Sequence, residues 1–187
     1  REKCNKPVAI LLDTKGPEIR TGNFENGKVH VFSGQTFTLV GGEKIIGDEN
    51  RVNITYPDLY KDVEPGSVIL IDDGLIKMEV EKIVGQDVVC KVKNDGKISD
   101  KKGVNVPDIH INMEYLSEQD KKDIIFGIEQ DVDYIAASFV RNAECILEIR
   151  SYLNKCGAPY IPIIAKIENQ QGVENIDGIV SLADGVM

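Results

Sequence analysis

The sequence of 187 residues contains no tryptophan, only four cysteines and only two histidines. The cysteines, at positions 4, 90, 145 and 156, include no Cys-x-x-Cys pair, and their irregular spacing gives no disulfide or zinc framework. The histidines, at positions 30 and 110, add no metal-ligand spacing. No apolar run approaches the roughly 18 residues that a membrane helix needs. We therefore expect reduced thiols, no His/Cys metal centre and no membrane partner.

Positive charge is also scarce. The 22 Lys and Arg residues are outnumbered by 31 Asp and Glu residues, which gives a net charge of -9 and a sequence pI of about 4.8. Proteins that wrap nucleic acid or lie on anionic membranes need a basic surface, so both kinds of partner are excluded. No signal peptide opens the sequence, which favours a cytoplasmic location.

The first part of the sequence resembles a buried strand. Residues 7–12 form a continuous apolar run that ends abruptly in a polar segment beginning at Asp13. A run of this kind is typical of a strand buried on both faces of a parallel sheet.

Between about residues 22 and 105 the pattern changes to short strands separated by glycine-containing turns. Strands are predicted over 28–32, 36–40, 67–71, 75–81 and 87–93, with hairpin turns at 26–27, 72–74 and 94–96. Strands of this length and spacing indicate a small all-β barrel or sandwich.

From about residue 106 strands and helices alternate. Ser117 and Asn142 are predicted to cap two helices, the second of which carries Ile146, Ile149 and Leu153 on one face and ends near Gly157. Strands are predicted over 133–139 and 161–168, followed by a helix over 170–182 and the start of a strand at 184–187. Alternation of this kind predicts right-handed βα units in a parallel sheet. The simplest fold is an α/β barrel interrupted by an inserted β domain.

Three of the predicted strands end in polar residues, and the carboxyl ends of parallel barrel strands meet at one rim. The polar ends lie at 13–15, 138–141 and 166–169. Lys166 and Glu168 share a face because strand side chains alternate, so together they could hold a metal ion and an anionic substrate. The alternative is that each strand simply becomes polar where it reaches the surface.

Five segments of the sequence resemble motifs of pyruvate kinases. Residues 13–20, Asp-Thr-Lys-Gly-Pro-Glu-Ile-Arg, match a segment of that family, and residues 163–173 match its best-known motif. Shorter matches lie in the expected order at 71–76, 101–107 and 137–141. The resemblance covers the whole sequence, with one departure at 106–108, where Val-Pro-Asp stands in place of the usual Leu-Pro-Gly.

The resemblance implies an (α/β)8 barrel with a β-rich lid domain inserted after its third strand. The predicted fold is then α/β, with barrel segments at 1–21 and 106–187 flanking an inserted β-barrel lid at 22–105. The sequence would run from barrel strand three to the start of strand six. The implied reaction transfers the phosphoryl group of phosphoenolpyruvate to ADP, giving pyruvate and ATP, in a homotetrameric parent enzyme.

The resemblance also assigns roles to residues of the predicted barrel segments. It implies that Lys166 stabilises charge on the phosphoryl group and the enolate. Glu168 would be one of two acidic ligands of Mg2+ (or Mn2+), a hard cation suited to carboxylate oxygen. Asp13 and Thr14 match the family's ligands for K+.

Three further residues match family positions near the predicted lid. Arg20 and Lys102 correspond to side chains that contact the nucleotide. Glu18 corresponds to a position where an acid goes with K+ dependence and a lysine with independence. The physical reason is that a lysine ammonium could supply the positive charge that K+ otherwise provides.

The family motifs expected before and after this sequence include further K+ ligands, a phosphate-contacting arginine and the second Mg2+ ligand. We therefore expect the 187 residues alone to be catalytically inactive. Two alternatives remain at this point. The chain could act as a non-catalytic β-domain binding module, or it could belong to a different barrel enzyme that acts on phosphoenolpyruvate or pyruvate.

Overall fold

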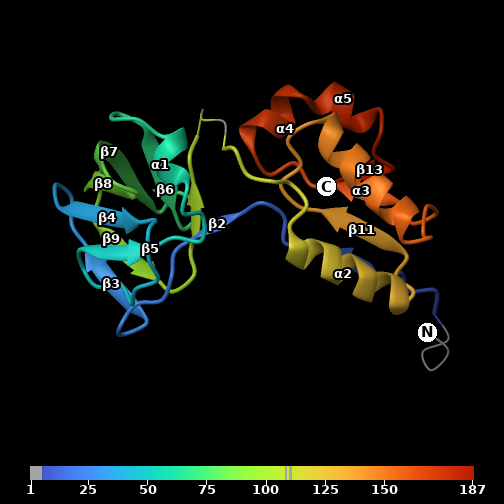
Figure 1. Cartoon of the computed structure of the whole chain (residues 1–187), viewed down its shortest axis with the longest axis horizontal. Helices are drawn as coiled ribbons and strands as arrows, with labels where there is room; N and C mark the ends of the chain where they lie inside the picture. Colours follow the sequence, from blue (N-terminus) through green and yellow to red (C-terminus); the bar gives the residue numbers. More distant parts are fainter. Residues whose placement is uncertain (1–5, 108, 110) are drawn as a thin grey trace. The chain divides into compact units, whose positions relative to one another are not determined.

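The computed structural model of the chain describes residues 6–107, 109 and 111–187. Cys4, His110 and the hinge residue Asp108 lie outside the described residues. Two compact units are present (Figure 1): a β unit, Glu18–Asn112, and an α/β unit formed by the residues up to Pro17 together with Met113–Met187. The predicted boundaries at 21/22 and 105/106 stay predictions.

The β unit contains a closed seven-stranded sheet. Its strands, in sheet order, are β2 (Ile19–Arg20), β10 (Gly103–Asn105), β6 (Val68–Ile71), β7 (Ile76–Val84), β8 (Asp87–Val92), β4 (Thr36–Val40) and β5 (Arg51–Asn53). An antiparallel bridge between Thr21 and Ile54 joins the two ends of this order. The sheet therefore closes into the predicted small barrel, whose interior holds Phe37, Leu39 and Met78, all fully buried.

Two of the three predicted hairpins are wrong. The turn at 72–74 does join β6 to β7, and its three residues all have positive φ. In contrast, β3 (Lys28–Val31) and β9 (Gly96–Ser99) pair with each other as a separate two-stranded ribbon. One reason is Asn94, whose side chain accepts a hydrogen bond from Lys77 N (2.8 Å) and donates one to Leu75 O (2.8 Å). These bonds hold the chain against β7 instead of folding it back along β8.

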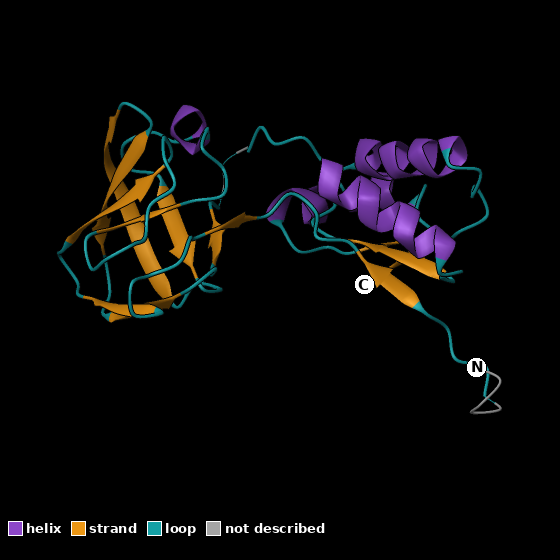
Figure 2. Cartoon of the chain, turned by 60° about the horizontal axis from the view of Figure 1, so that its bottom comes forward, coloured by secondary structure: helices purple, strands orange, loops and turns teal. Residues whose placement is uncertain are grey.

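The α/β unit is built on a parallel sheet of four strands. The strands follow each other in chain order: β1 (Leu11–Asp13), β11 (Tyr134–Ala137), β12 (Ile163–Ala165) and β13 (Gly185–Val186). The helices are α2 (Glu118–Glu129), α3 (Ala143–Lys155), α4 (Gln170–Glu174) and α5 (Ile176–Val180), and a short α1 (Leu59–Asp62) lies in the β unit. Figure 2 shows helices gathered on one side of these strands, as crossovers of one hand require. The predicted α/β fold with an inserted β barrel is confirmed, although the helix expected at 170–182 is two short helices.

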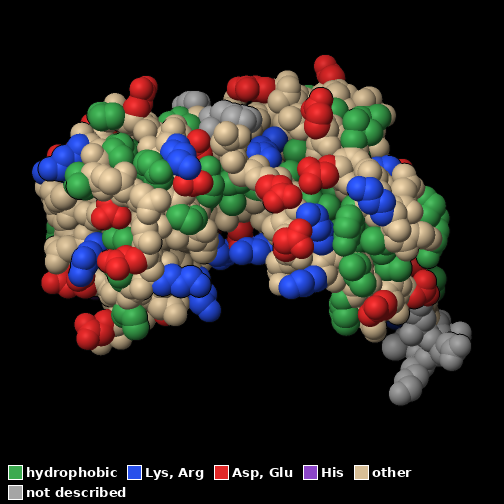
Figure 3. Space-filling model, in the orientation of Figure 1, with side chains coloured by type: hydrophobic (Ala, Val, Ile, Leu, Met, Phe, Trp, Pro, Cys, Tyr) green, Lys and Arg blue, Asp and Glu red, His purple; other side chains and the backbone are tan. Residues whose placement is uncertain are grey.

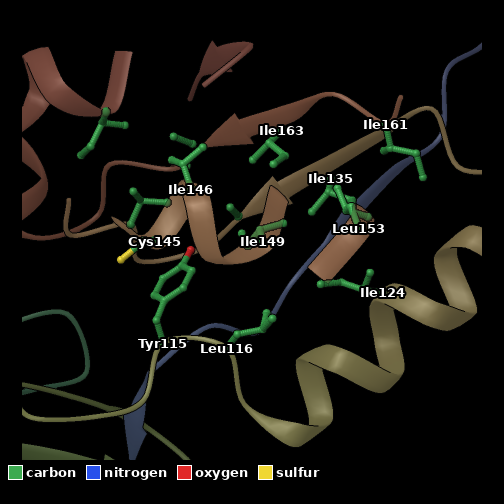
Figure 4. Packing of buried hydrophobic residues seen from close by; sticks show 14 of the residues in the cluster. Tyr115, Leu116, Ile124, Ile135, Cys145, Ile146, Ile149, Leu153, Ile161 and Ile163 are labelled. Carbon is green, nitrogen blue, oxygen red and sulfur yellow. The ribbon is translucent and has the colours of Figure 1, made fainter. Parts of the chain in front are cut away.

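Local signals in the sequence position both long helices. Ser117 and Asp120 form a reciprocal capping box at the start of α2, and the Asn142 side chain accepts from Cys145 N at the start of α3. The buried face of α3 is the predicted one, and Figure 4 shows Ile146, Ile149 and Leu153 of α3 together with Ile135 and Ile163 of the sheet. This core fixes the sheet on which the candidate site is built.

The predicted burial of residues 7–12 on both faces is wrong for this chain. β1 comprises Leu11–Asp13 and pairs with β11 on one side. Val8, Ile10 and Leu11 are 56, 47 and 38% exposed. Within the described residues β1 is an edge strand, so its side chains have neighbouring side chains of the sheet on one side only and stay partly exposed.

Candidate active site

The parallel register brings polar side chains together at the carboxyl ends of the strands. Asp13 is paired with Ala136, and Ala136 is paired with Ile164. Ser138 lies two residues after Ala136, and Lys166 lies two residues after Ile164. Because strand side chains alternate, Ser138 and Lys166 lie on the same face as Asp13.

The Lys166 ammonium lies at the centre of this cluster. Its Nζ is 3.0 and 3.3 Å from the two carboxylate oxygens of Asp13, 3.3 Å from Glu168 Oε1 and 3.0 Å from Ser138 Oγ. Burial lowers the pKa of Lys166, but the hydrogen bond to Asp13 and the charges of Glu168 and Asp13 outweigh burial and raise it above its ordinary value. Lys166 therefore carries a fixed positive charge, and its side chain is 16% exposed.

Two carboxylates face this one ammonium, so the charges of the cluster do not cancel. Asp13 is the more open of the two, with a side chain that is 59% exposed against 34% for Glu168. Glu168 Oε2 accepts a hydrogen bond from Phe139 N at 3.0 Å, which fixes the orientation of its carboxylate. The excess negative charge favours a bound cation next to an anionic ligand.

Thr14 is also at this rim, but its hydroxyl is directed at the backbone. Thr14 is buried, and its Oγ1 donates to Ala136 O (3.3 Å) and accepts from Ser138 N (3.1 Å). The hydroxyl thereby ties the end of β1 to the end of β11. The atoms that Thr14 could offer to a cation are the remaining lone pair of this hydroxyl and its main-chain carbonyl oxygen, a type of ligand that hard cations accept.

Ser138 is the residue of this cluster that the sequence did not assign. Its position at the rim was predicted, since it ends the strand before Phe139. Its role could not be predicted, because a serine at a strand end is common and gives no charge signal. In the structure Ser138 is buried and contacts both Lys166 and Asp13 (3.0 Å each).

The predicted nucleotide contacts lie in the β unit: Arg20 ends β2, and Lys102 directly precedes β10, the strand paired with β2. Arg20 pairs through Nε with Glu18 Oε1 at 2.6 Å, and its Nη1 donates to Lys101 O at 2.9 Å. The hydrogen bond to Glu18 is the main cause of a raised Arg20 pKa. The sequence predicted a local negative charge at Glu18, and the ion pair with Arg20 offsets that charge.

Lys102 lies directly before β10, the next strand in the same sheet. Its Nζ is 2.9 Å from Asp72 Oδ1, in the turn between β6 and β7. The sequence predicted Asp72 as a turn residue, which is confirmed by its φ of 55°, but not as the partner of Lys102. Arg20 and Lys102 thus come from segments far apart in the sequence and lie close together, because Arg20 is paired with Gly103, the residue after Lys102.

The charged surface is mixed in sign. Figure 3 shows acidic and basic side chains interspersed over the visible face.

Within 6–107, 109 and 111–187, no group of three His, Cys, Asp or Glu residues is placed to hold a metal ion. A search of the same residues finds no helix with the length and apolarity that crossing a membrane requires.

Known proteins match this chain over its full length. Residues 1–187 match the family described as "Pyruvate kinase, barrel domain". Pyruvate kinases from Clostridium acetobutylicum and Clostridium perfringens are 52 and 46% identical over 187 residues, which is 100% of this chain and 40% of each of those proteins. A crystal structure of a pyruvate kinase from Cryptosporidium parvum gives a TM-score of 0.86 at 35% identity and covers 100% of this chain and 39% of the other. The chain therefore spans about 40% of the length of these curated relatives.

Proposed function

The chain belongs to the pyruvate kinase family, and we propose that it supplies part of the site that transfers the phosphoryl group of phosphoenolpyruvate to ADP. The observation that carries this proposal is the Lys166 ammonium held between two carboxylates at a strand-end rim. Phosphoryl transfer depends on positioning and on neutralising charge around the moving group. The match of residues 1–187 to the pyruvate kinase barrel domain favours this function over a binding module without catalysis.

Lys166 is the group proposed to act directly on the substrate. Its ammonium would contact the phosphoryl oxygens and the developing enolate, and its fixed charge would favour both. Its carboxylate partner Asp13 is more than half exposed, so the ammonium is reachable from the rim.

The donor set fits the proposed cations in kind. Mg2+ binds through one or two carboxylates, waters and substrate phosphates, so Glu168 is suited to be one protein ligand. Asp13 and the main-chain carbonyl of Thr14 are suited to K+. When bound, a divalent ion would neutralise charge on the transferring phosphoryl group. Glu168 and Asp13 are the residues of this rim that would hold cations.

Arg20 and Lys102 are proposed to contact the nucleotide. Both carry positive charge, Arg20 on β2 and Lys102 directly before the paired strand β10, and each is oriented by a carboxylate, Glu18 or Asp72. Planar guanidinium and flexible ammonium groups are the side chains that bind phosphate. Family membership also supports a homotetrameric enzyme, and the free thiols of Cys90, Cys145 and Cys156 are typical of the reducing cytoplasm.

A chimera tests the proposed reaction. Residues 1–187 would replace the matching segment of the Clostridium acetobutylicum pyruvate kinase, and pyruvate formation from phosphoenolpyruvate and ADP would be measured with Mg2+ and K+ present. We expect activity in the chimera, and a loss of about 100- to 1,000-fold in kcat for Lys166→Met. Lys155→Met, an exposed lysine at the end of α3, is the matched control. An inactive chimera, or equal activity in both variants, would contradict the proposal. The isolated 187 residues are expected to give no turnover.

The same chimera tests the proposed K+ dependence. With K+ replaced by tetramethylammonium at constant ionic strength, we expect the rate to fall. Glu18→Lys should weaken that dependence because it adds a positive charge, whereas Glu25→Lys, which adds the same charge at an exposed position, should not. Equal rates with and without K+ would reject the roles of Glu18, Asp13 and Thr14.

A further inference from the structure

Ser138 is a buried serine whose polar atoms are all engaged. Its side chain and backbone are 3% exposed. Its N donates to Thr14 Oγ1 at 3.1 Å, and its carbonyl oxygen accepts from the Tyr115 hydroxyl at 3.0 Å. These contacts come from the segments before and after the β unit in sequence, so the position of Ser138 is fixed from both sides.

The Ser138 hydroxyl has a defined direction. It donates its proton to Asp13 Oδ1 at 3.0 Å and accepts from Lys166 Nζ at 3.0 Å. A hydroxyl has one proton and two lone pairs, so committing the proton to Asp13 leaves the lone pairs for the ammonium. Hydrogen bonds to a charged group are the stronger class, and they are strongest where water is excluded.

The other two partners of the ammonium have a second task under the proposed function. Glu168 and Asp13 are the groups assigned to cations, and each cation competes with Lys166 for the same carboxylate. The Ser138 hydroxyl carries no charge and is not assigned to an ion. It is therefore the partner that can hold the ammonium throughout the reaction.

We propose that Ser138 is a positioning residue, whose hydroxyl holds the Lys166 ammonium at the rim in the geometry that phosphoryl transfer needs. The inference rests on the proposed function for its catalytic consequence and on the contacts above for its geometry. The backbone supports the same role. Phe139 follows with a φ of 53°, unusual for a large side chain, and its N holds Glu168. One turn thus orients both the hydroxyl and a carboxylate beside Lys166.

Nitrogen NMR of lysine side chains tests the geometry on the 187-residue chain itself. The order parameter of the Lys166 ammonium would be measured in the wild type, Ser138→Ala, Ser138→Thr and Ser181→Ala, the last a matched control whose hydroxyl bonds to Gly178 O. We expect a marked fall in Ser138→Ala, recovery in Ser138→Thr and no change in Ser181→Ala. An unchanged order parameter in Ser138→Ala would overturn the proposal. If that variant does not fold, Ser138→Cys, a weaker acceptor, carries the same expectation.

Steady-state kinetics of the chimera test the consequence. Ser138→Ala should lower kcat by about 10- to 100-fold, the range for losing a hydrogen bond to a charged group. KM for phosphoenolpyruvate should stay within about twofold, and Ser138→Thr should restore most of kcat. An unchanged kcat in Ser138→Ala would overturn the proposal. An inactive chimera with Ser138 intact would instead refute the proposed function, and the NMR result would then decide the positioning role separately.

Discussion

Removing the Asp120 carboxylate should destabilise the α/β unit by about 2–4 kcal/mol. Asp120 is 1% exposed, and its carboxylate accepts three hydrogen bonds, one of them from the Ser117 hydroxyl to Oδ2 at 2.5 Å. Its Oδ2 accepts from Ser117 N (3.3 Å) in the capping box of α2, and its Oδ1 accepts from Gly16 N (3.1 Å), directly before the chain enters the β unit. In Asp120→Ala the lost cap costs about 0.5–2 kcal/mol. The buried Gly16 N–H left without its acceptor adds about 1–3 kcal/mol.

Urea unfolding followed by far-UV circular dichroism would measure this loss, because the chain has no tryptophan to report by fluorescence. Hydrogen exchange followed by mass spectrometry would locate the loss of stability. We expect faster amide exchange in residues 113–129 and unchanged exchange in residues 18–112. Asp120→Asn keeps one acceptor and should lose less. Glu118→Ala is the control, since that side chain is 80% exposed and a surface ion pair of this kind contributes little to stability. Equal losses in Asp120→Ala and Glu118→Ala would refute the reasoning.

Three further predictions concern single residues. Gly16→Ala should lower the free energy of unfolding by clearly more than Gly34→Ala, as the midpoints of urea unfolding would show. Both glycines have positive φ. A Cβ at Gly16 would lie 2.7 Å from a main-chain carbonyl oxygen, whereas a Cβ at Gly34 would have nothing within 4 Å. The hydrogen bond from Arg150 lowers the pKa of Asp184 below its ordinary 3.8, so the stabilisation is complete above that pH and is lost as the pH falls through the lowered value. The stability of Asp184→Asn, measured by unfolding at a series of acidic pH values, should lack this loss. A dependence of stability on pH equal to that of the wild type would contradict the prediction. Burial raises the pKa of the Cys90 thiol to about 12, so Cys90 should react with iodoacetamide at neutral pH only in denaturant, as mass spectrometry can check.

Features that depend on neighbouring residues in the sequence were predicted correctly. The capping box at Ser117 and the buried face of α3 follow from local spacing, and each is present. The alternation of strand side chains likewise predicted that Lys166 and Glu168 share a face. Their meeting with Asp13 required only the rule that parallel strands end at one rim.

Other features that depend on distant partners were not predicted. A turn signal such as 94–96 indicates that the chain bends, but it does not indicate which strand the following residues pair with. In the structure the strand after this turn, β9, pairs with β3. Burial of residues 7–12 depends on which strands and helices pack around them, and an apolar run does not say which of these are present. The role of Ser138, the contact of Arg20 with Lys101 O and the pairing of Lys102 with Asp72 depend on distances between segments far apart in the sequence, which no pattern in the sequence encodes.

The Mg2+ requirement of the chimera tests the central account most directly. The measurement is the Mg2+ concentration that gives half-maximal pyruvate formation, compared between Glu168→Gln and Glu174→Gln, an exposed glutamate of α4 whose carboxylate accepts from Gln170 Nε2. We predict that Glu168→Gln raises this concentration by at least about tenfold, because it removes a charged ligand, and that Glu174→Gln leaves it unchanged. Equal Mg2+ requirements in the two variants would contradict the assignment of this rim as the phosphoryl-transfer site.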